Sequence, residues 1–155
     1  MKIKLYHGTS EKKYKIIKKQ GFLNPGYLTS DDEQASYYAE CVAEDDGSNE
    51  VILTVEVDTD TLKADTASYN EPLSYVLKQN DTSEYDWHEQ IKNGEIKYPS
   101  DKDWHVSLEF VKCVRNTDNI YLKNITYDGS LCSEDEQAMT KAIKLEYLKS
   151  SKLNL

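Results

Sequence analysis

The chain has 155 residues, with 19 Lys and Arg against 28 Asp and Glu, and its formal charge is -9 at pH 7. This length suits one compact domain, which we expect to span residues 1–155. The acidic balance argues against broad, sequence-independent binding of nucleic acid, because phosphates are neutralised by clustered Lys and Arg. Aliphatic residues are few, but 12 Tyr and 2 Trp can supply apolar area for a core.

The cysteines, the histidines and the apolar runs exclude several other classes. No apolar run approaches the roughly 18 residues of a membrane span, and Met1–Gly8 lacks the apolar region of a signal peptide. We therefore expect a cytoplasmic protein with no membrane partner. Cys41, Cys113 and Cys132 match neither a disulfide framework nor paired metal-ligand spacing, so we expect reduced, mostly buried thiols and no metal site.

The amino-terminal residues predict a strand followed by a helix. Apolar and polar side chains alternate over Met1–His7, which is typical of a half-buried strand and points His7 inward. Ser10 is placed to cap a helix over about Glu11–Gln20, and Gly21 can end it in the left-handed conformation. The apolar side of this helix is expected to comprise Tyr14 and Ile17, with Ile16 as a further candidate.

A turn, a second helix and a clear strand are predicted next. Asn24–Gly26 is typical of a turn, and Tyr27–Thr29 is a short extended piece. Ser30–Glu33 has the pattern of a capping box, which predicts a helix over about Asp31–Ala43. Strict alternation over Val51–Asp58 predicts a strand. The apolar stripe of the helix is expected to comprise Ala35, Tyr38, Ala39 and Val42.

The second half of the chain has weaker patterns. Glu71–Gln79 predicts a short helix, and residues 80–104 are expected to form an irregular loop or insertion. Val106–Arg115 and Asn119–Tyr127 predict two strands. A second capping box predicts a helix over about Ser133–Leu148. With no repeat and no linker, the chain indicates one α+β domain.

His7 and the residues after it form a candidate binding corner. An inward ring at a strand end is followed by Gly8, which lets a ligand approach the backbone, and by the hydroxyls of Thr9 and Ser10. The alternative is a satisfied core histidine beside a serine that merely caps a helix.

Tyrosines near the second predicted helix form a candidate aromatic site. Tyr27 precedes the helix, and Tyr38 lies on its apolar stripe, so their rings could hold a flat group between them. Tyr37 is the substitute for Tyr38 if the helix register differs by one residue. The alternative is that these are ordinary core tyrosines.

Glu109 is the candidate acid. It lies in an otherwise apolar predicted strand, where a carboxylate is costly to bury without a partner or a role. The alternative is an outward-facing, solvated side chain, and Glu95 is a weaker competitor from the irregular segment.

Together these features resemble the ADP-ribosyltransferase superfamily, in the His-Tyr-Glu branch of diphtheria toxin, poly(ADP-ribose) polymerases and small bacterial and phage relatives. The order and spacing agree over residues 3–58, and beyond them the likeness is one stretch around Glu109. The resemblance implies a split antiparallel β-sandwich with flanking short helices. The matching positions are Leu5–Ser10, Gly21-Phe22, Gly26–Ser30, Ala35, Tyr38-Ala39, Val51–Asp58 and Ser107–Glu109.

The resemblance also implies how NAD would be held. His7 would hydrogen-bond a ribose hydroxyl, and the backbone of Gly8 would bind the nicotinamide carboxamide. Thr9 or Ser10 would add a hydroxyl contact to the same ligand.

The resemblance assigns the remaining residues to nicotinamide binding and to catalysis. Tyr27 and Tyr38, or Tyr37 in its place, would stack about the nicotinamide ring. Glu109 would bond the 2′-hydroxyl of the nicotinamide ribose and stabilise the cation that develops there. The catalytic residues would then be Glu109, His7 and Tyr27.

The implied activity is mono-ADP-ribosylation of a macromolecule, with NAD as co-substrate and nicotinamide released. A protein acceptor is favoured, and DNA or RNA stay open as alternatives, because the chain has no long basic tract. Two other functions share the fold: a non-catalytic module that binds NAD or ADP-ribose, and an NAD-dependent RNA 2′-phosphotransferase. The latter needs basic side chains that the matching segments supply only sparsely.

Overall fold

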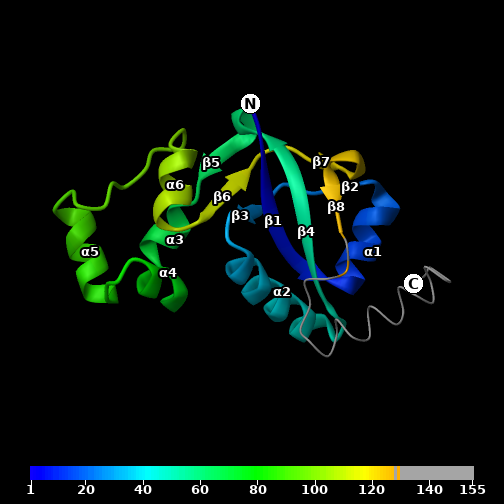
Figure 1. Ribbon diagram of the computed structural model, residues 1–155, viewed down its shortest axis with the longest axis horizontal. Coiled ribbons are helices and arrows are strands. Elements are labelled where there is room, and N and C mark those ends of the chain that lie inside the picture. Colours follow the sequence, from blue (N-terminus) through cyan, green and yellow to red (C-terminus); the bar gives the residue numbers. More distant parts are fainter. Residues whose placement is uncertain (128, 130–155) are drawn as a thin grey trace.

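A six-stranded antiparallel sheet forms the centre of the molecule (Figure 1). The computed structural model describes residues 1–127 and residue 129. In spatial order the strands are β5 (Leu62–Ala64), β6 (Cys113–Asn116), β3 (Tyr27–Thr29), β1 (Lys2–Ser10), β4 (Glu50–Asp58) and β8 (Ile125–Thr126). Strands β1 and β4 pair along their whole length. With the helices around it, the sheet confirms the predicted α+β class.

Helix α1 (Glu11–Gln20) has the predicted bounds, because both of its ends are marked in the sequence. The Ser10 hydroxyl accepts a hydrogen bond from the Lys13 backbone N–H, and Gly21 ends the helix with a φ of 96°. Ile17 is buried, as expected, but Ile16 is 57 % exposed. The prediction that Ile16 belongs to the apolar side was therefore wrong.

Helix α2 (Asp32–Asp46) begins and ends later than predicted. Its N-cap is Asp31 rather than Ser30, because the Asp31 carboxylate accepts from two backbone N–H groups of the first turn. The helix continues past Ala43 and ends at Gly47, which adopts the left-handed conformation with a φ of 72°.

The segment between β4 and β6 is more helical than the sequence predicted. After the 3-10 turn η1 (Thr59–Thr61) and strand β5, four helices follow: α3 (Thr66–Asn70), α4 (Ser74–Gln79), α5 (Glu84–Lys92) and α6 (Trp104–Phe110). The helix predicted to begin at Glu71 begins at Ser74. Residues 80–104 are not wholly irregular, because they include α5 with Ser83 as its N-cap. Trp87 is the one fully buried residue of α5. The helix therefore has only a weak amphipathic pattern, which is insufficient to predict it from the sequence.

The predicted strand Val106–Arg115 was wrong over its first half. Residues up to Phe110 form α6, and the strand begins at Cys113. A short apolar run buried on more than one side has no clear period, so it does not separate a strand from a helix. Glu109 consequently lies on a helix.

The last predicted strand is broken into pieces. Asn119–Tyr127 contains β7 (Ile120–Tyr121), the 3-10 turn η2 (Leu122–Asn124) and β8, and β7 pairs with β2 (Phe22–Leu23) in a separate two-stranded sheet. Cys113 is buried, whereas Cys41 lies on the solvent side of α2 and is exposed. Cys132 and the helix predicted over Ser133–Leu148 lie outside the described residues.

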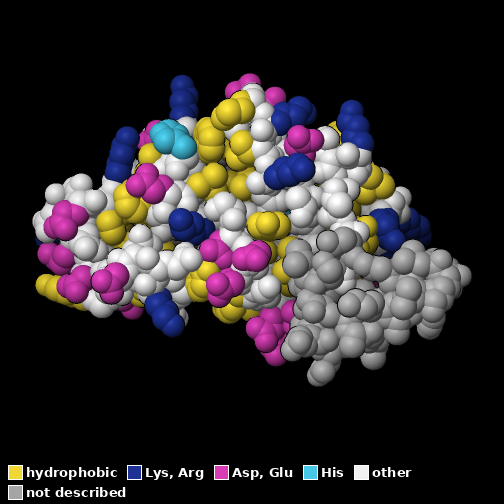
Figure 2. Space-filling model, in the orientation of Figure 1, with side chains coloured by type: hydrophobic (Ala, Val, Ile, Leu, Met, Phe, Trp, Pro, Cys, Tyr) yellow, Lys and Arg dark blue, Asp and Glu magenta, His cyan; other side chains and the backbone are white. Residues whose placement is uncertain are grey.

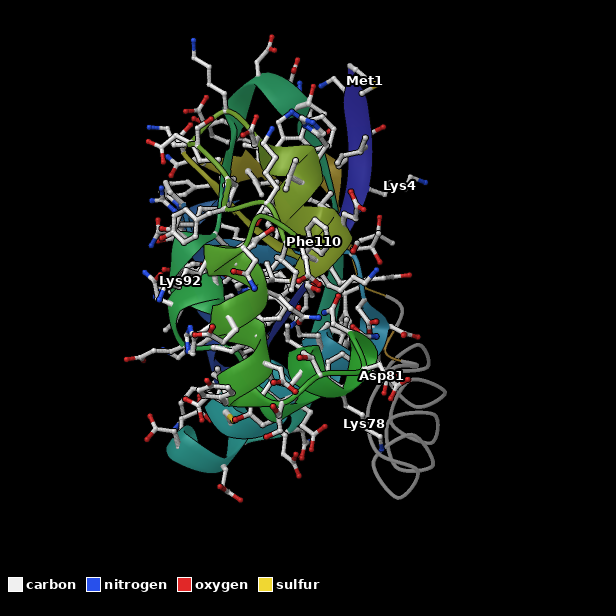
Figure 3. The ribbon with its side chains drawn as sticks, turned by 90° about the vertical axis from the view of Figure 1, so that its left-hand side faces the viewer. Met1, Lys4, Lys78, Asp81, Lys92 and Phe110 are labelled. Atoms are coloured by element: carbon white, nitrogen blue, oxygen red, sulfur yellow. The ribbon has the colours of Figure 1, made fainter. Side chains whose placement is uncertain are left out.

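Three clusters of buried hydrophobic residues are present in residues 1–127: two of them, the main core and the second core, meet at β6, and the third comprises Ala35, Ala39 and Ile52 where α2 packs on β1 and β4. The main core lies on the side of the sheet that α1 covers, and the second core lies among α3 to α6, where Figure 3 shows Phe110 above the helices that end near Lys78 and Lys92. The main core comprises Leu5, Ile17, Leu23, Leu28, Val51, Leu53, Val55, Val57, Leu62, Val114 and Ile120. The second core comprises Tyr69, Val76, Trp87, Ile96, Val111 and Cys113.

None of the helices in residues 1–127 has the length and apolar character needed to cross a membrane.

Candidate functional site

Strands β1 and β3 separate where the sequence placed the binding corner. Their ladder holds at one pair, Tyr6 opposite Thr29. At the next residue of β1, the side chain of His7 connects the two strands, because its Nδ1 atom lies 3.1 Å from the Tyr27 carbonyl oxygen. A carbonyl can only accept a hydrogen bond, so Nδ1 carries a proton in this contact.

The contact with Tyr27 fixes the tautomer of the His7 ring. Burial lowers the pKa of His7 below the ordinary 6.5, and the bond to the Tyr27 carbonyl opposes this shift only in part. The ring is therefore neutral at pH 7, with its proton on Nδ1. The Nε2 atom then has a lone pair that can accept a hydrogen bond from a hydroxyl group.

Gly8 is required by the packing of α2. A Cβ atom at this position would lie 2.1 Å from the Ala35 carbonyl oxygen and 2.7 Å from the Ala39 backbone nitrogen. The helix thus crosses β1 in direct backbone contact, which only glycine permits. This packing explains the glycine without a ligand, and it leaves the role implied for the Gly8 backbone as a prediction.

Thr9 and Ser10 are both buried, with 2 % and 0 % exposure. The Ser10 hydroxyl accepts from the Lys13 backbone N–H and donates to the Asp46 carboxylate, which ties α1 to the end of α2. The capping role weighed for Ser10 is therefore present. Thr9 lies opposite Val51 and on the Leu5 side of β1.

The three candidate tyrosines differ in their exposure and contacts. Tyr27 is 49 % exposed. Burial, followed by the nearby Cys113, Asp65, Tyr37 and Tyr27, raises the pKa of Tyr38 well above its usual range, so the Tyr38 phenol lies within electrostatic reach of Tyr27. Tyr37 is exposed and contacts the edge of the Tyr38 ring, with 5.6 Å between ring centroids. Tyr37 therefore faces solvent, and the pairing of Tyr38 with Tyr27 about a ligand ring stays a prediction.

The sheet separates the histidine from this aromatic pair. Side chains alternate along β1, so His7 projects from the face opposite to Tyr6. Tyr27 shares the face of Thr29, which pairs with Tyr6. The two parts of the predicted site therefore lie on opposite faces of the sheet and are connected through the Tyr27 carbonyl.

Glu109 is not brought into contact with these residues. It is exposed on α6, and within residues 1–127 it forms no ion pair. Its carboxylate lies within electrostatic reach of the Tyr69 phenol, which donates to the Val106 carbonyl at 3.1 Å. The prediction that Glu109 begins a strand was wrong, and the weaker candidate Glu95 is exposed after α5.

Asp65 is an acid near the site that the sequence reasoning missed. Its side chain is buried, with 2 % exposure, and accepts hydrogen bonds from the Ser68 backbone N–H and hydroxyl. It also raises the pKa of the Cys113 thiol, after the larger effect of burial, and lies within electrostatic reach of Tyr38 and Tyr69. An Asp three residues before a Ser is an N-cap pattern, and this signal could have identified it.

No family model, no curated protein and no solved structure matches the chain. Among the residues that the structure describes, no group of three or more His, Cys, Asp or Glu is placed to hold a metal ion.

Proposed function

We propose that the protein transfers ADP-ribose from NAD to a macromolecular acceptor, with an ADP-ribosyltransferase-like arrangement of its sheet. The observation that carries this proposal is the hydrogen bond from His7 Nδ1 to the Tyr27 carbonyl, beside the single ladder pair of β1 and β3. It leaves Nε2 as an acceptor for a ribose hydroxyl, and it ends at the backbone of Tyr27, whose half-exposed ring on the other face of the sheet can stack on nicotinamide.

The proposed reaction exchanges one bond at the ribose carbon C1′. The bond from C1′ to the nicotinamide nitrogen breaks, and its electron pair leaves with neutral nicotinamide. The acceptor nucleophile forms the new bond to C1′ and loses its proton to a carboxylate or to water. Positive charge builds on the ribose in between, so a nearby carboxylate stabilises the transition state.

Glu109 is the carboxylate assigned to this role by the resemblance. Its position on α6, exposed and beside Tyr69, also supports a second function. If Glu109 stays away from the bound dinucleotide, the site holds NAD or ADP-ribose without turning it over. The second candidate is therefore a binding module of the same fold.

A protein is the favoured acceptor. The face in Figure 2 carries acidic and basic side chains interspersed, with no single large basic patch. Binding along a nucleic-acid backbone requires clustered Lys and Arg. The same charge pattern disfavours the RNA 2′-phosphotransferase alternative on this face.

Nicotinamide release and NAD binding, measured side by side, test the proposal. Wild-type protein, His7→Ala and Glu109→Gln are incubated with NAD and a cell lysate, and NAD affinity is measured by calorimetry. We expect Glu109→Gln to lower release by about 10²–10³-fold while NAD still binds. His7→Ala should weaken the binding of NAD itself.

Glu84→Gln is the matched control, because Glu84 is an exposed carboxylate on α5 with no assigned role at the site. It should leave release unchanged. Binding without release in the wild type would select the binding module, and neither binding nor release would refute both functions.

A further inference from the structure

A row of exposed side chains crosses β3, β6 and β5 on the face opposite to the main core. Tyr27 lies opposite Arg115, and Arg115 lies opposite Lys63, so the three residues form one continuous row. Leu28 and Val114, which alternate with them, point into the main core. The Tyr27, Arg115 and Lys63 side chains therefore face solvent together.

Arg115 is an unusual residue in this chain. It is the only arginine in a protein with a net charge of -9. Its Nη2 atom lies 4.0 Å from the Asp101 carboxylate, and its Nε atom donates to the Ala64 carbonyl at 3.5 Å. Lys63 Nζ lies 3.9 Å from the same Asp101 carboxylate.

These ion pairs are loose and open to replacement. Both lie close to the 4.0 Å limit for a salt bridge, and the Asp101 side chain is 64 % exposed. Exposed pairs of this kind contribute little to stability. Two cations beside one weakly held carboxylate can therefore exchange Asp101 for a more strongly charged anion.

We propose that Arg115 and Lys63 bind the diphosphate of the dinucleotide whose aromatic ring stacks on Tyr27. This inference rests on the proposed function and extends it to a phosphate site. The planar guanidinium fork matches phosphate oxygens in two hydrogen bonds, and Lys63 adds a point charge. Asp101 holds the two cations when the diphosphate is absent.

The geometry of the row suits a nucleotide. The Arg115 side chain reaches from β6 to the Ala64 carbonyl on β5, so its charge lies about two strand spacings, or ~10 Å, from β3 and Tyr27. A nucleotide also separates its ring from its phosphates, by one ribose. The backbone of a single nucleic-acid strand has the same chemistry, and the test must separate these two ligands.

Calorimetric titration with ADP-ribose, nicotinamide riboside and an oligothymidine strand tests the assignment. Arg115→Gln should weaken ADP-ribose binding by about tenfold or more, because a charge-assisted pair of hydrogen bonds is lost. The affinity for nicotinamide riboside, which has no phosphate, should stay unchanged. Asp101→Asn should tighten ADP-ribose binding by about two- to fivefold, because the competing carboxylate is neutralised.

Lys97→Gln is the control variant. Lys97 lies 3.8 Å from Asp103 in an ion pair outside the row, and its loss should leave every affinity unchanged. Equal ADP-ribose affinity in wild type, Arg115→Gln and Asp101→Asn would overturn the inference while leaving NAD binding, and the proposed function, in place. An effect of Arg115→Gln on oligothymidine alone would also overturn it. A wild type that binds neither NAD nor ADP-ribose would refute both.

Discussion

Neighbouring residues His7 and Gly8 have separate structural tasks. The His7 ring forms a hydrogen bond between β1 and β3 beyond the single ladder pair of these strands, and Gly8 allows the backbone of α2 to pack directly on β1. Alternation in the sequence predicted the inward direction of His7, because it depends only on the strand period. The sequence could not predict the contact of Gly8, because the partner lies on a helix whose position depends on tertiary packing.

Gly8→Ala should destabilise the fold. The added methyl group would lie 2.1 Å from the Ala35 carbonyl oxygen, so α2 must move away from β1. Overpacking of this kind costs about 1–3 kcal/mol of unfolding free energy. Urea denaturation followed by circular dichroism measures the loss.

Gly26→Ala is the matched control for this prediction. A Cβ atom at Gly26 would meet no atom within 4 Å, and its φ is not in the left-handed region. Its unfolding free energy should stay close to that of the wild type. Equal stabilities of both variants would show that α2 does not rest on Gly8.

Helix α6 shows which local structure the sequence determines and which it leaves open. Ends marked by a serine cap and a left-handed glycine sufficed to predict α1. Helix α6 lacks a side-chain hydrogen bond at its N-cap, and its apolar residues serve both cores. The conformation of α6 is fixed by long-range packing. The predicted strand over Val106–Arg115 was therefore wrong at Glu109, which lies on the helix.

Ser107 and Glu109 provide a test of the helix. Ser107 is fully buried, and its hydroxyl accepts from the Asp65 backbone N–H at 2.9 Å and donates to the Cys113 carbonyl at 2.6 Å. Ser107→Ala leaves the buried Asp65 N–H without its acceptor, which should cost about 1–3 kcal/mol.

Glu109→Gln, two residues away, should leave the unfolding free energy unchanged, since its side chain is exposed on α6. A strand would instead place residues 107 and 109 on one face. Similar losses in both variants, measured by chemical denaturation, would contradict the helix.

At the scale of the whole molecule, the two cores are joined by adjacent residues of one strand. Cys113 belongs to the second core and Val114 to the main core. Gln34 and Thr29 strengthen this junction, because the Thr29 hydroxyl donates to the Gln34 side chain at 2.7 Å and Gln34 donates to the Val111 carbonyl at 3.4 Å. The sequence predicted a single domain, but no pattern in it indicated that the buried residues form separate cores.

The two cores should unfold as one unit, and the two tryptophans can report it. Trp87 is fully buried in the second core, and Trp104 packs against the main core. Trp87→Phe and Trp104→Phe each leave one fluorescent reporter. Within each variant, we expect the fluorescence and circular dichroism transitions in urea to coincide, because β6 belongs to both cores. Separate transitions would indicate that the lobe of α3 to α6 melts on its own.

The alternation of β6 also restricts where the chain can tolerate a change in length. Lys112, with a φ of 62°, is the link between α6 and this strand. One extra residue there would exchange the directions of Cys113 and Val114, and would send every following side chain of β6 to the wrong layer. Insertions should therefore survive in the surface turn after α5, whereas a single-residue insertion or deletion beside Lys112 should abolish expression of folded protein.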